Sequence, residues 1–424
     1  MRCLLRCFLL LWALTAVPQA GAQTAPEPIR LAMIESFSGP FANVGESWLR
    51  NLQFAVDAVN KRGGVRVADA NGRLVQRPLV IETFDGKGQV EDSLIGLRAA
   101  QDRHIGFVLQ GASSAVAGAL VDAIERNNQR NPDRRMVFLN YAAVAPELTN
   151  QKCSFWHFRF DIHAGMRMHA LTEVLKADTH VKRVWLINQD YSFGRDVAAL
   201  ARQQLAAKRP DVVIAGEDLH PIGRIKDFTP YVQKMIAAKV DTVITGNWGA
   251  DLALLVKAAR ESGLDAKFYT FYGNSLGAPA AIGEAGVGRV LAVAEWHPNA
   301  GGKASDAYVN AFRATLSNPR NDYQHLRTTT LIDMLVAAME RAKSADPLAV
   351  ARALEGATWR NPIQSATMRA ADHQLQQPVY VTVMRRKGEA IAFDNEGSGY
   401  GFKTERLLSA AEAEQPTSCQ MTRP

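Results

Sequence analysis

The chain has 424 residues, of which 47% are hydrophobic and 21% are charged, and its formal net charge is +7. A chain of this length normally divides into two domains, each with its own hydrophobic core. The charge is mild for the length, and no dense Lys/Arg block with interleaved aromatic residues occurs. The sequence therefore lacks the electrostatic footprint of a nucleic-acid-binding protein.

The first predicted element is a secretory signal peptide over residues 1–22. Two arginines precede an apolar run over residues 8–17, and small residues at 20–22 follow it. This arrangement is typical of a signal peptide that is cleaved near Ala22. The alternative is a membrane anchor, but the run is shorter than the roughly 18 residues that a bilayer span needs. We therefore expect an exported, soluble protein.

Strands and helices alternate in the next part of the chain. Short apolar runs predict the strands, and apolar residues at helical spacing predict the helices between them. The predicted strands span residues 29–35, 79–84, 105–109 and 136–141, and the predicted helices lie at 48–59, 90–97, 113–127 and 164–176. This order implies a parallel sheet that is covered by helices on both faces.

The same pattern continues with too many strands for one small sheet. Further strands are predicted at 184–188, 212–215, 242–245, 268–271 and 291–294, then helices at 308–316 and 329–343, and late strands near Ala366 and at 379–384. We predict an α/β protein with two Rossmann-like lobes, each built on a parallel, doubly wound sheet. No long Pro/Gly/Ser linker divides the chain, so several crossings between the lobes are expected.

Five loops follow the predicted strands at 110–114, 140–146, 189–195, 246–249 and 269–274. Ligands bind at the carboxyl ends of strands in open α/β sheets, so these loops are the candidate site. In the first loop, free backbone N–H groups at a helix start and the hydroxyls of Ser113 and Ser114 suit a ligand carboxylate. The alternative there is ordinary N-capping by serine, and both roles can coexist. The alternatives for the other loops are a plain turn, a solvated helix start and, for Trp248, core packing.

Signatures of catalysis are missing from the sequence. It contains no Gly-x-Gly-x-x-Gly after a strand, no Walker loop, no Gly-x-Ser-x-Gly elbow and no histidine pair at metal-ligand spacing. The pattern favours a binding protein without a cofactor or metal over an enzyme.

Two of the four cysteines, Cys153 and Cys419, lie outside the predicted signal peptide. Disulfides persist in the compartments that such a peptide leads to. We predict a bridge between these two cysteines, and the alternative is a pair of free, buried thiols.

Several segments in order resemble the periplasmic leucine/isoleucine/valine-binding proteins. These segments are Ile29 to Gly64 with its Phe37-Ser38-Gly39-Pro40 and Gly45, Gly111 to Ser114, Ala145 to Thr149, and Tyr191 to Asp196. The resemblance covers nearly the whole chain after the signal peptide. It implies the type I periplasmic binding protein fold, in which three hinge crossovers join the lobes.

The resemblance also implies boundaries and a function. Residues 23–159 and 296–368 are expected in the N-terminal lobe, 160–295 and 369–424 in the C-terminal lobe, and the crossovers near 158–161, 294–296 and 368–373. Such proteins bind a small polar solute between the lobes, close by a hinge motion, and pass the solute to an ABC transporter permease in the inner membrane. We expect a periplasmic monomer of this kind. The alternatives are a periplasmic sensor that presents the solute to a membrane receptor, and a secreted α/β enzyme.

Four first-lobe positions can be carried over from the family. The serine that meets the ligand carboxylate matches Ser114, with Ser113 beside it, and the small-residue backbone contact matches Ala142. Val144 stands where the family has threonine, so one hydroxyl is lost.

The second lobe departs further from the family. Phe193 replaces a tyrosine, Trp248 keeps an aromatic wall, and Tyr272 stands where the amino-acid binders have the glutamate that receives the ligand ammonium. An unpaired, desolvated ammonium is costly, so a typical aliphatic amino acid fits only if another acid, such as Asp190 or Glu295, takes this role. The remaining groups suit a carboxylate or an amide with an aromatic or otherwise flat body.

Overall fold

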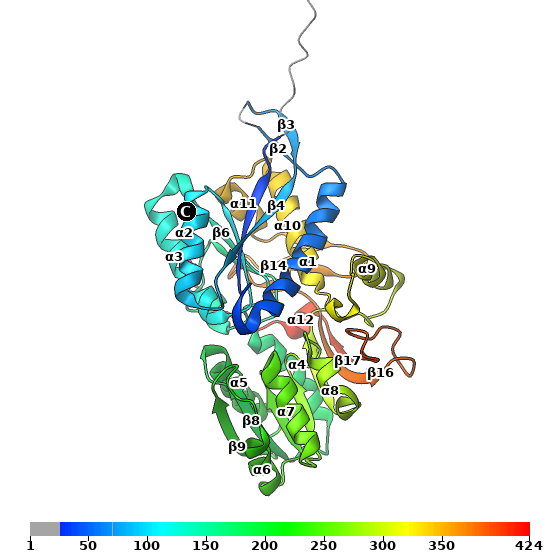
Figure 1. The fold of residues 1–424 in the computed structure, drawn as a ribbon. Helices are drawn as coiled ribbons and strands as arrows, with labels where there is room; N and C mark the ends of the chain where they lie inside the picture. Colours follow the sequence, from blue (N-terminus) through cyan, green and yellow to red (C-terminus); the bar gives the residue numbers. More distant parts are fainter. Residues whose placement is uncertain (1–25, 70) are drawn as a thin grey trace, which may run out of the picture.

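The computed structural model describes residues 26–69 and 71–424, and Figure 1 shows two lobes joined by several segments of chain. The predicted signal peptide, residues 1–22, lies outside the described residues. Among the described helices, none is both long and apolar enough to cross a membrane.

The first lobe is built on a five-stranded sheet in which every neighbouring pair is parallel. Helices α2 and α3 pack together, and α1 packs on α10. In spatial order the strands are β4 (Leu79–Asp85), β1 (Ile29–Glu35), β5 (Phe107–Gln110), β6 (Val137–Asn140) and β7 (His157–Arg159). The helices are α1 (Ala42–Lys61), α2 (Val90–Asp102), α3 (Ser114–Arg130), α10 (Leu326–Ala342) and α11 (Pro347–Leu354). One hydrophobic core therefore joins residues between 29 and 160 to residues between 331 and 375.

The second lobe contains a seven-stranded sheet. In spatial order its strands are β17 (Tyr400–Leu408), β16 (Val379–Arg386), β12 (Val290–Ala294), β11 (Lys267–Thr270), β10 (Thr242–Thr245), β8 (Arg183–Gln189) and β9 (Val213–His220). Its helices are α4 (Ala164–Ala177), α5 (Ser192–Lys208), α6 (Thr229–Ala237), α7 (Ala250–Glu261), α8 (Ala278–Ile282) and α12 (Ala410–Ala413).

The prediction of a wholly parallel second sheet is wrong for its last two strands. β16 pairs with β12 antiparallel, and β17 pairs with β16 antiparallel. Parallel neighbours are usually linked by a helical crossover that packs on the same sheet. The chain instead passes through the first lobe between β12 and β16, and the link from β16 to β17 over residues 387–399 contains no helix. Both sheets are thus mainly parallel, as the α/β prediction requires.

Smaller elements were not predicted. Among them are the hairpin β2 (Val65–Ala68) and β3 (Leu74–Arg77), the strands β13 (Thr358–Arg360) and β15 (Leu375–Gln376), which pair with β14 (Ser365–Met368), and five short 3-10 helices of the described residues. Helix α9 (Lys303–Arg313) begins before the predicted helix at 308. The 3-10 helices are η1 (Gly39–Phe41), η2 (Pro132–Arg134), η3 (Pro146–Thr149), η4 (Gly283–Gly286) and η5 (Pro319–Asn321). The predicted strand near Ala366 corresponds to β14.

The chain passes between the two hydrophobic cores at three places. Phe160 belongs to the first core and Ile162 to the second, and the chain leaves β12 of the second sheet near Glu295. Leu375, which was expected in the C-terminal lobe, packs in the first core, whereas Val379 packs in the second. The last passage therefore lies between β15 and β16.

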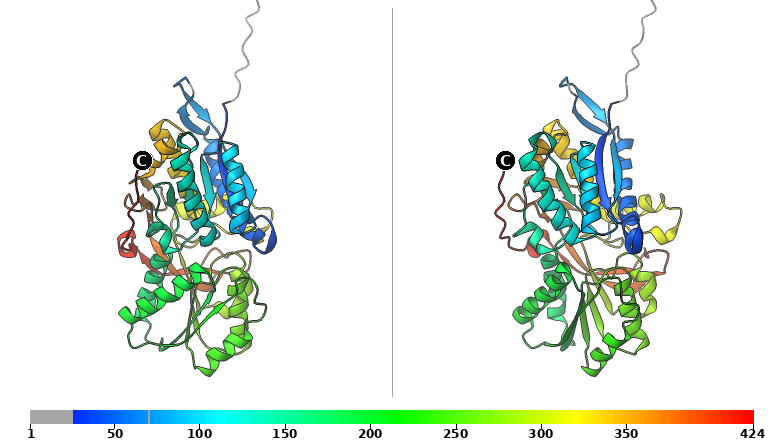
Figure 2. Two further views of the ribbon diagram at one scale, coloured as in Figure 1. Left: turned by 90° about the vertical axis from the view of Figure 1, so that its left-hand side faces the viewer. Right: turned by 60° about the vertical axis from the view of Figure 1, so that its left-hand side comes forward.

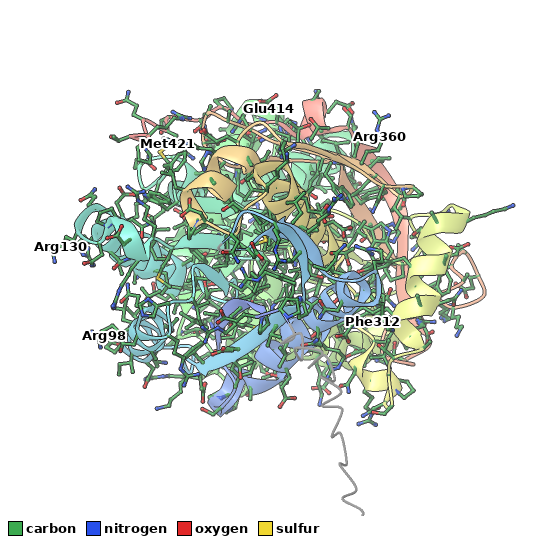
Figure 3. The ribbon with its side chains drawn as sticks, turned by 90° about the horizontal axis from the view of Figure 1, so that it is seen from above. Arg98, Arg130, Phe312, Arg360, Glu414 and Met421 are labelled. Carbon is green, nitrogen blue, oxygen red and sulfur yellow. A yellow bond between two sulfur atoms is a disulfide. The ribbon has the colours of Figure 1, made fainter. Side chains whose placement is uncertain are left out.

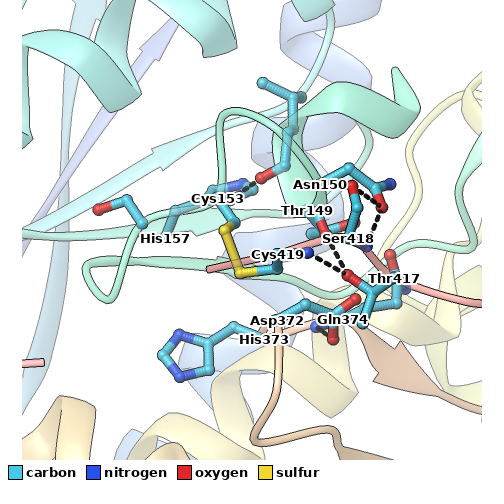
Figure 4. The surroundings of a disulfide bond; sticks show 12 residues. Thr149, Asn150, Cys153, His157, Asp372, His373, Gln374, Thr417, Ser418 and Cys419 are labelled. Carbon is cyan, nitrogen blue, oxygen red and sulfur yellow. Dashed lines mark hydrogen bonds between the residues drawn. A yellow bond between two sulfur atoms is a disulfide. The ribbon is translucent and has the colours of Figure 1, made fainter. Parts of the chain in front are cut away.

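The predicted disulfide is confirmed. Cys153 and Cys419 are joined with an S–S distance of 2.07 Å (Figure 4). Around the bridge, the Thr417 hydroxyl donates to the carbonyl of Thr149 at 2.9 Å, and the Ser418 N–H donates to Oδ1 of Asn150 at 2.8 Å.

These contacts fix the segment 414–424, called the tail below, against the first lobe. Figure 2 shows it leaving α12 and running up the side of that lobe, and Glu414 and Met421 lie along the same side of the molecule in Figure 3. Met421 packs against the first core, and Arg423 donates to Glu355 at 2.7 Å. The tail is therefore a fourth connection between the lobes, and a covalent bond holds it at Cys419.

Candidate ligand-binding site

The strand-end loops of both sheets line one cavity between the lobes. It encloses about 1130 Å³ when the space at its opening is included. Six of the seven predicted binding residues line it: Ser114, Ala142, Val144, Phe193, Trp248 and Tyr272. The seventh, Ser113, is not part of the lining. The structure therefore brings strand-end loops of both lobes to one cavity.

Ser113 and Ser114 have different surroundings. The Ser113 side chain accepts a hydrogen bond from the N–H of Val116 and is the N-cap of α3, which is the alternative role considered for it. Ser114 is buried, and its oxygen accepts from the N–H of Ala145 at 3.2 Å. A hydroxyl that accepts still has its own proton to donate. Ser114 can therefore donate a hydrogen bond into the cavity.

A carboxylate of the protein itself already occupies the loop after β5. Oε1 of Glu35 accepts from the N–H groups of Gly111 and Ala112, both at 2.8 Å, and from the Tyr141 hydroxyl at 2.6 Å. The N–H groups of Gly111 and Ala112, which lie in this loop before the start of α3, are therefore not free for a ligand. Burial raises the pKa of Glu35, while the hydrogen bonds from Tyr141, Ala112 and Gly111 oppose that shift. The sequence gave no local signal for this pairing, because Glu35 ends a strand far from the loop.

Gly111 is required where two loops approach each other. A Cβ at this position would lie 2.6 Å from the Tyr141 ring and 2.7 Å from the backbone nitrogen of Ala142. Contacts this short do not occur, so any larger residue would push the β5 and β6 loops apart. The glycine therefore keeps Ser114 and Ala142 on the same wall of the cavity.

Aromatic side chains form much of the wall on both sides. In the first lobe, Trp48 stacks on His325 with ring centroids 4.1 Å apart. In the second lobe, the Trp248 indole N–H donates to the Tyr191 hydroxyl at 3.0 Å, which fixes the orientation of the indole. These flat surfaces suit a ligand with a flat or apolar body.

One aromatic contact joins the two lobes at the cavity. Phe41 of η1 packs on Trp248, with ring centroids 4.8 Å apart. The hydroxyl of Tyr323, which precedes α10, also donates to the carbonyl of Ser275 in the second lobe. Both contacts exist only while the lobes are close together, so this structure is a closed arrangement.

Four charged side chains form a connected cluster beside the cavity. Nη2 of Arg167 lies 2.8 and 2.9 Å from the two oxygens of Asp161. Nη1 of Arg327 lies 2.6 Å from Oε2 of Glu295 and 3.3 Å from Oδ1 of Asp161. All four side chains are buried, and Arg167, Glu295 and Arg327 line the cavity. We name them the charge cluster.

Only part of this cluster could be anticipated. Glu295 was named as a possible acid for a ligand ammonium, and it lines the cavity. Asp190, the other candidate, pairs with Arg195 on the exposed surface and is not part of the lining. The two arginines were missed because each lies in a helix whose apolar spacing predicts nothing about a charged interior.

The histidines beside the cavity are neutral near pH 7. Burial, followed by the charges of Arg327 and Arg167, holds the pKa of His325 well below its usual range. Burial also lowers the pKa of His297 to about 3. Neither ring supplies a positive charge for an anionic ligand.

Comparison with known proteins identifies the family. A family model described as "Periplasmic binding protein" matches residues 28–389. A "Leu/Ile/Val-binding protein homolog 4" from Brucella melitensis biotype 1 is 33% identical over 97% of both chains. The chain belongs to the periplasmic binding protein family. Members of this family are binding proteins, in agreement with the prediction that the chain is not an enzyme.

Solved structures of other periplasmic binding proteins share the fold. The leucine-, isoleucine-, valine-, threonine- and alanine-binding protein of Brucella ovis, in a closed conformation, superposes with a TM-score of 0.80 at 29% identity over 94% of this chain and all of that one. A solute-binding protein of an ABC transporter from R. palustris, in complex with benzoate, gives a TM-score of 0.75 at 15% identity over 93% of this chain and 99% of that one. The predicted type I periplasmic binding protein fold is therefore confirmed.

Proposed function

We propose that this periplasmic binding protein captures a small polar solute in the cavity between its lobes and delivers it to an ABC importer. The observation that carries the proposal is that strand-end loops of both sheets line a single cavity, which Phe41 and Trp248 close across the two lobes. Ligands of open α/β sheets bind at this end of the strands.

The solute in this proposal resembles a branched-chain amino acid, or is an aromatic carboxylate or amide. Ser114, Ala142 and Val144 hold its polar end, and Phe193, Trp248 and Tyr272 face its body. The Brucella relative is named for leucine, isoleucine and valine, and the R. palustris structure contains benzoate, so both kinds of solute have precedents in related proteins.

The partner in this proposal is an inner-membrane permease, and the protein acts as a monomer in the periplasm. This location follows from the family together with the predicted cleavage of a signal peptide near Ala22.

Native mass spectrometry of the freshly purified protein tests the proposal, because a captured solute adds its mass to the folded chain. Calorimetry with that solute then compares two neighbouring serine variants. Ser114→Ala removes a donor that faces the cavity, and we expect about 5- to 30-fold weaker binding, equivalent to about 1–2 kcal/mol. Ser113→Ala is the matched control, because it removes the α3 cap at a cost of about 1 kcal/mol in stability and leaves affinity unchanged.

The proposal fails if no solute co-purifies and none of a panel of amino acids, aromatic acids and amides binds. The assignment of the site fails if both serine variants bind as tightly as the wild type.

A further inference from the structure

We infer that the cavity selects solutes without net charge, meaning zwitterions or uncharged amides rather than anions, and that the Glu295–Arg327 pair sets this selection. The inference rests on the proposed function, since it presumes that the cavity binds a small solute. It goes beyond that function by ranking the solute classes that the proposal leaves open.

The positive and negative charges of the charge cluster balance one another. Two arginines face two carboxylates, and every charge has a partner: Arg167 with Asp161, and Arg327 with both Glu295 and Asp161. Each of these side chains is at most 5% exposed. A net charge brought into such a site loses its hydration and finds no unpaired counter-charge, which makes its binding unfavourable.

Arg167 has no capacity left for a ligand anion. Besides Asp161, its guanidinium donates to the carbonyl of Val293 at 2.9 Å and to that of Ile162 at 3.2 Å. It also lies over the ring of Tyr272, with 5.0 Å from Cζ to the ring centroid. Among the described residues that line the cavity, Arg327 is the other arginine; its Nη1 donates to Glu295 and Asp161, and its Nε has no hydrogen-bond partner in the protein.

The loop after β5 also disfavours a ligand anion. A ligand anion at a helix N-terminus is normally stabilised by free backbone N–H groups. Glu35 takes the N–H groups of Gly111 and Ala112, which come just before the Ser113 cap of α3, and its side chain lies directly behind the loop. The loop therefore offers a ligand anion two donors fewer.

The neutral state of His325 and His297 supports the same conclusion, because neither ring adds a positive charge to the wall. The charged groups left for a solute are those of the Glu295–Arg327 pair, and uncharged polar side chains such as Ser114, Asn274 and Gln324 line the same cavity. An uncharged amide can donate and accept at such sites, and a zwitterion brings both signs to a pair of opposite charges. A monoanion leaves one of the two charges unmatched.

Three flat probes of similar size measure the selection: benzamide is uncharged, benzoate is an anion and benzylamine is a cation near pH 7. Calorimetry uses the full exported chain after unfolding and refolding to remove any captured solute. We expect the wild type to bind benzamide at least tenfold more tightly than benzoate or benzylamine.

Single variants of Glu295 and Arg327 should shift the preference among the three probes in opposite directions. Glu295→Gln leaves Arg327 unbalanced, and we expect benzoate to become the preferred probe by about tenfold. Arg327→Gln leaves an unbalanced carboxylate, so benzylamine becomes preferred instead. If either single variant does not fold, the double variant Glu295→Gln/Arg327→Gln removes both charges and should keep the preference for benzamide.

Asp190→Asn is the matched control. It makes the same change in total charge as Glu295→Gln, but its side chain pairs with Arg195 on the surface and does not line the cavity. The ratio of benzamide to benzoate affinity should stay at the wild-type value.

The inference is overturned if the wild type binds benzoate as tightly as benzamide, or if Glu295→Gln gives the same ratio as Asp190→Asn. In both cases the proposed function stands, since a solute has bound. If neither the probes nor any co-purified solute binds to any form, the proposed function falls and the inference falls with it.

Discussion

Replacing both bridged cysteines, in the variant Cys153→Ser/Cys419→Ser, separates the tail from the first lobe. The bridge closes a loop whose ends are 266 residues apart in the sequence. Loop-closure entropy for such a length gives a ceiling of about 5.5 kcal/mol, and removal of a native disulfide typically costs about 2–5 kcal/mol. We expect the free energy of unfolding to fall by about 4 kcal/mol, because the other contacts of the tail remain in the folded state.

Equilibrium unfolding in urea measures this loss, with tryptophan fluorescence and far-ultraviolet circular dichroism as probes. The wild type under reducing conditions should match the double variant, since both lack the bond. Thr417→Ala is a control that keeps the bond and removes the hydrogen bond to Thr149, at an expected cost of about 1 kcal/mol. Equal urea midpoints for the oxidised wild type and the double variant would refute the reasoning.

Two further predictions concern the contacts between the lobes and the surroundings of α5. Burial and the nearby Glu147 carboxylate raise the pKa of Asp196 to about 6. A raised acid pKa penalises the folded state once the pH exceeds the unfolded value of about 3.9, and the penalty is complete above pH 6. Asp196→Asn should therefore stabilise the protein by about 1 kcal/mol at pH 8, after allowance for solvent screening, and should give no gain at pH 3. Thermal unfolding at both pH values measures this, and an equal gain at pH 3 and pH 8 would contradict it. Phe41→Ala removes the ring that contacts Trp248 from the other lobe and should weaken solute affinity about tenfold. Phe54→Ala, whose ring packs on Tyr308 and Phe312 of α9, should lower the melting temperature without changing affinity.

The architecture could largely be predicted because apolar runs and helical spacing are local properties of the sequence. The strand Ile29–Glu35 and the helices around it were found in this way. The direction in which two strands pair is not a local property, so the antiparallel pairing of β16 with β12 could not be read from its apolar pattern. β2 and β3 form a partly exposed hairpin with polar residues, so they lack the continuous apolar run that marks an equally short buried strand such as β10.

The same distinction between local and long-range features applies to the residues of the candidate site. Ser114 and Trp248 were found because each follows a predicted strand, and the rule that ligands bind at strand ends is general. Arg327 and Glu35 were missed because their roles depend on partners far away in the chain: Arg327 meets Glu295, and Glu35 meets the loop at Gly111. A long-range pairing of this kind is determined by the folded arrangement and leaves no spacing pattern in the sequence.

The interleaved path of the chain bears on how the protein can be divided. Helix α10 and strand β14 belong with strands made far earlier in the chain, and β16 and β17 complete a sheet that begins at β8. Every single cut between residues 165 and 375 divides both the first core, which runs from Ile29 to Leu375, and the second core, which runs from Val144 to Ala413, so neither half is an autonomous folding unit. Two fragments produced by such a cut should stay largely unstructured alone and regain structure only by complementation, when they are refolded together.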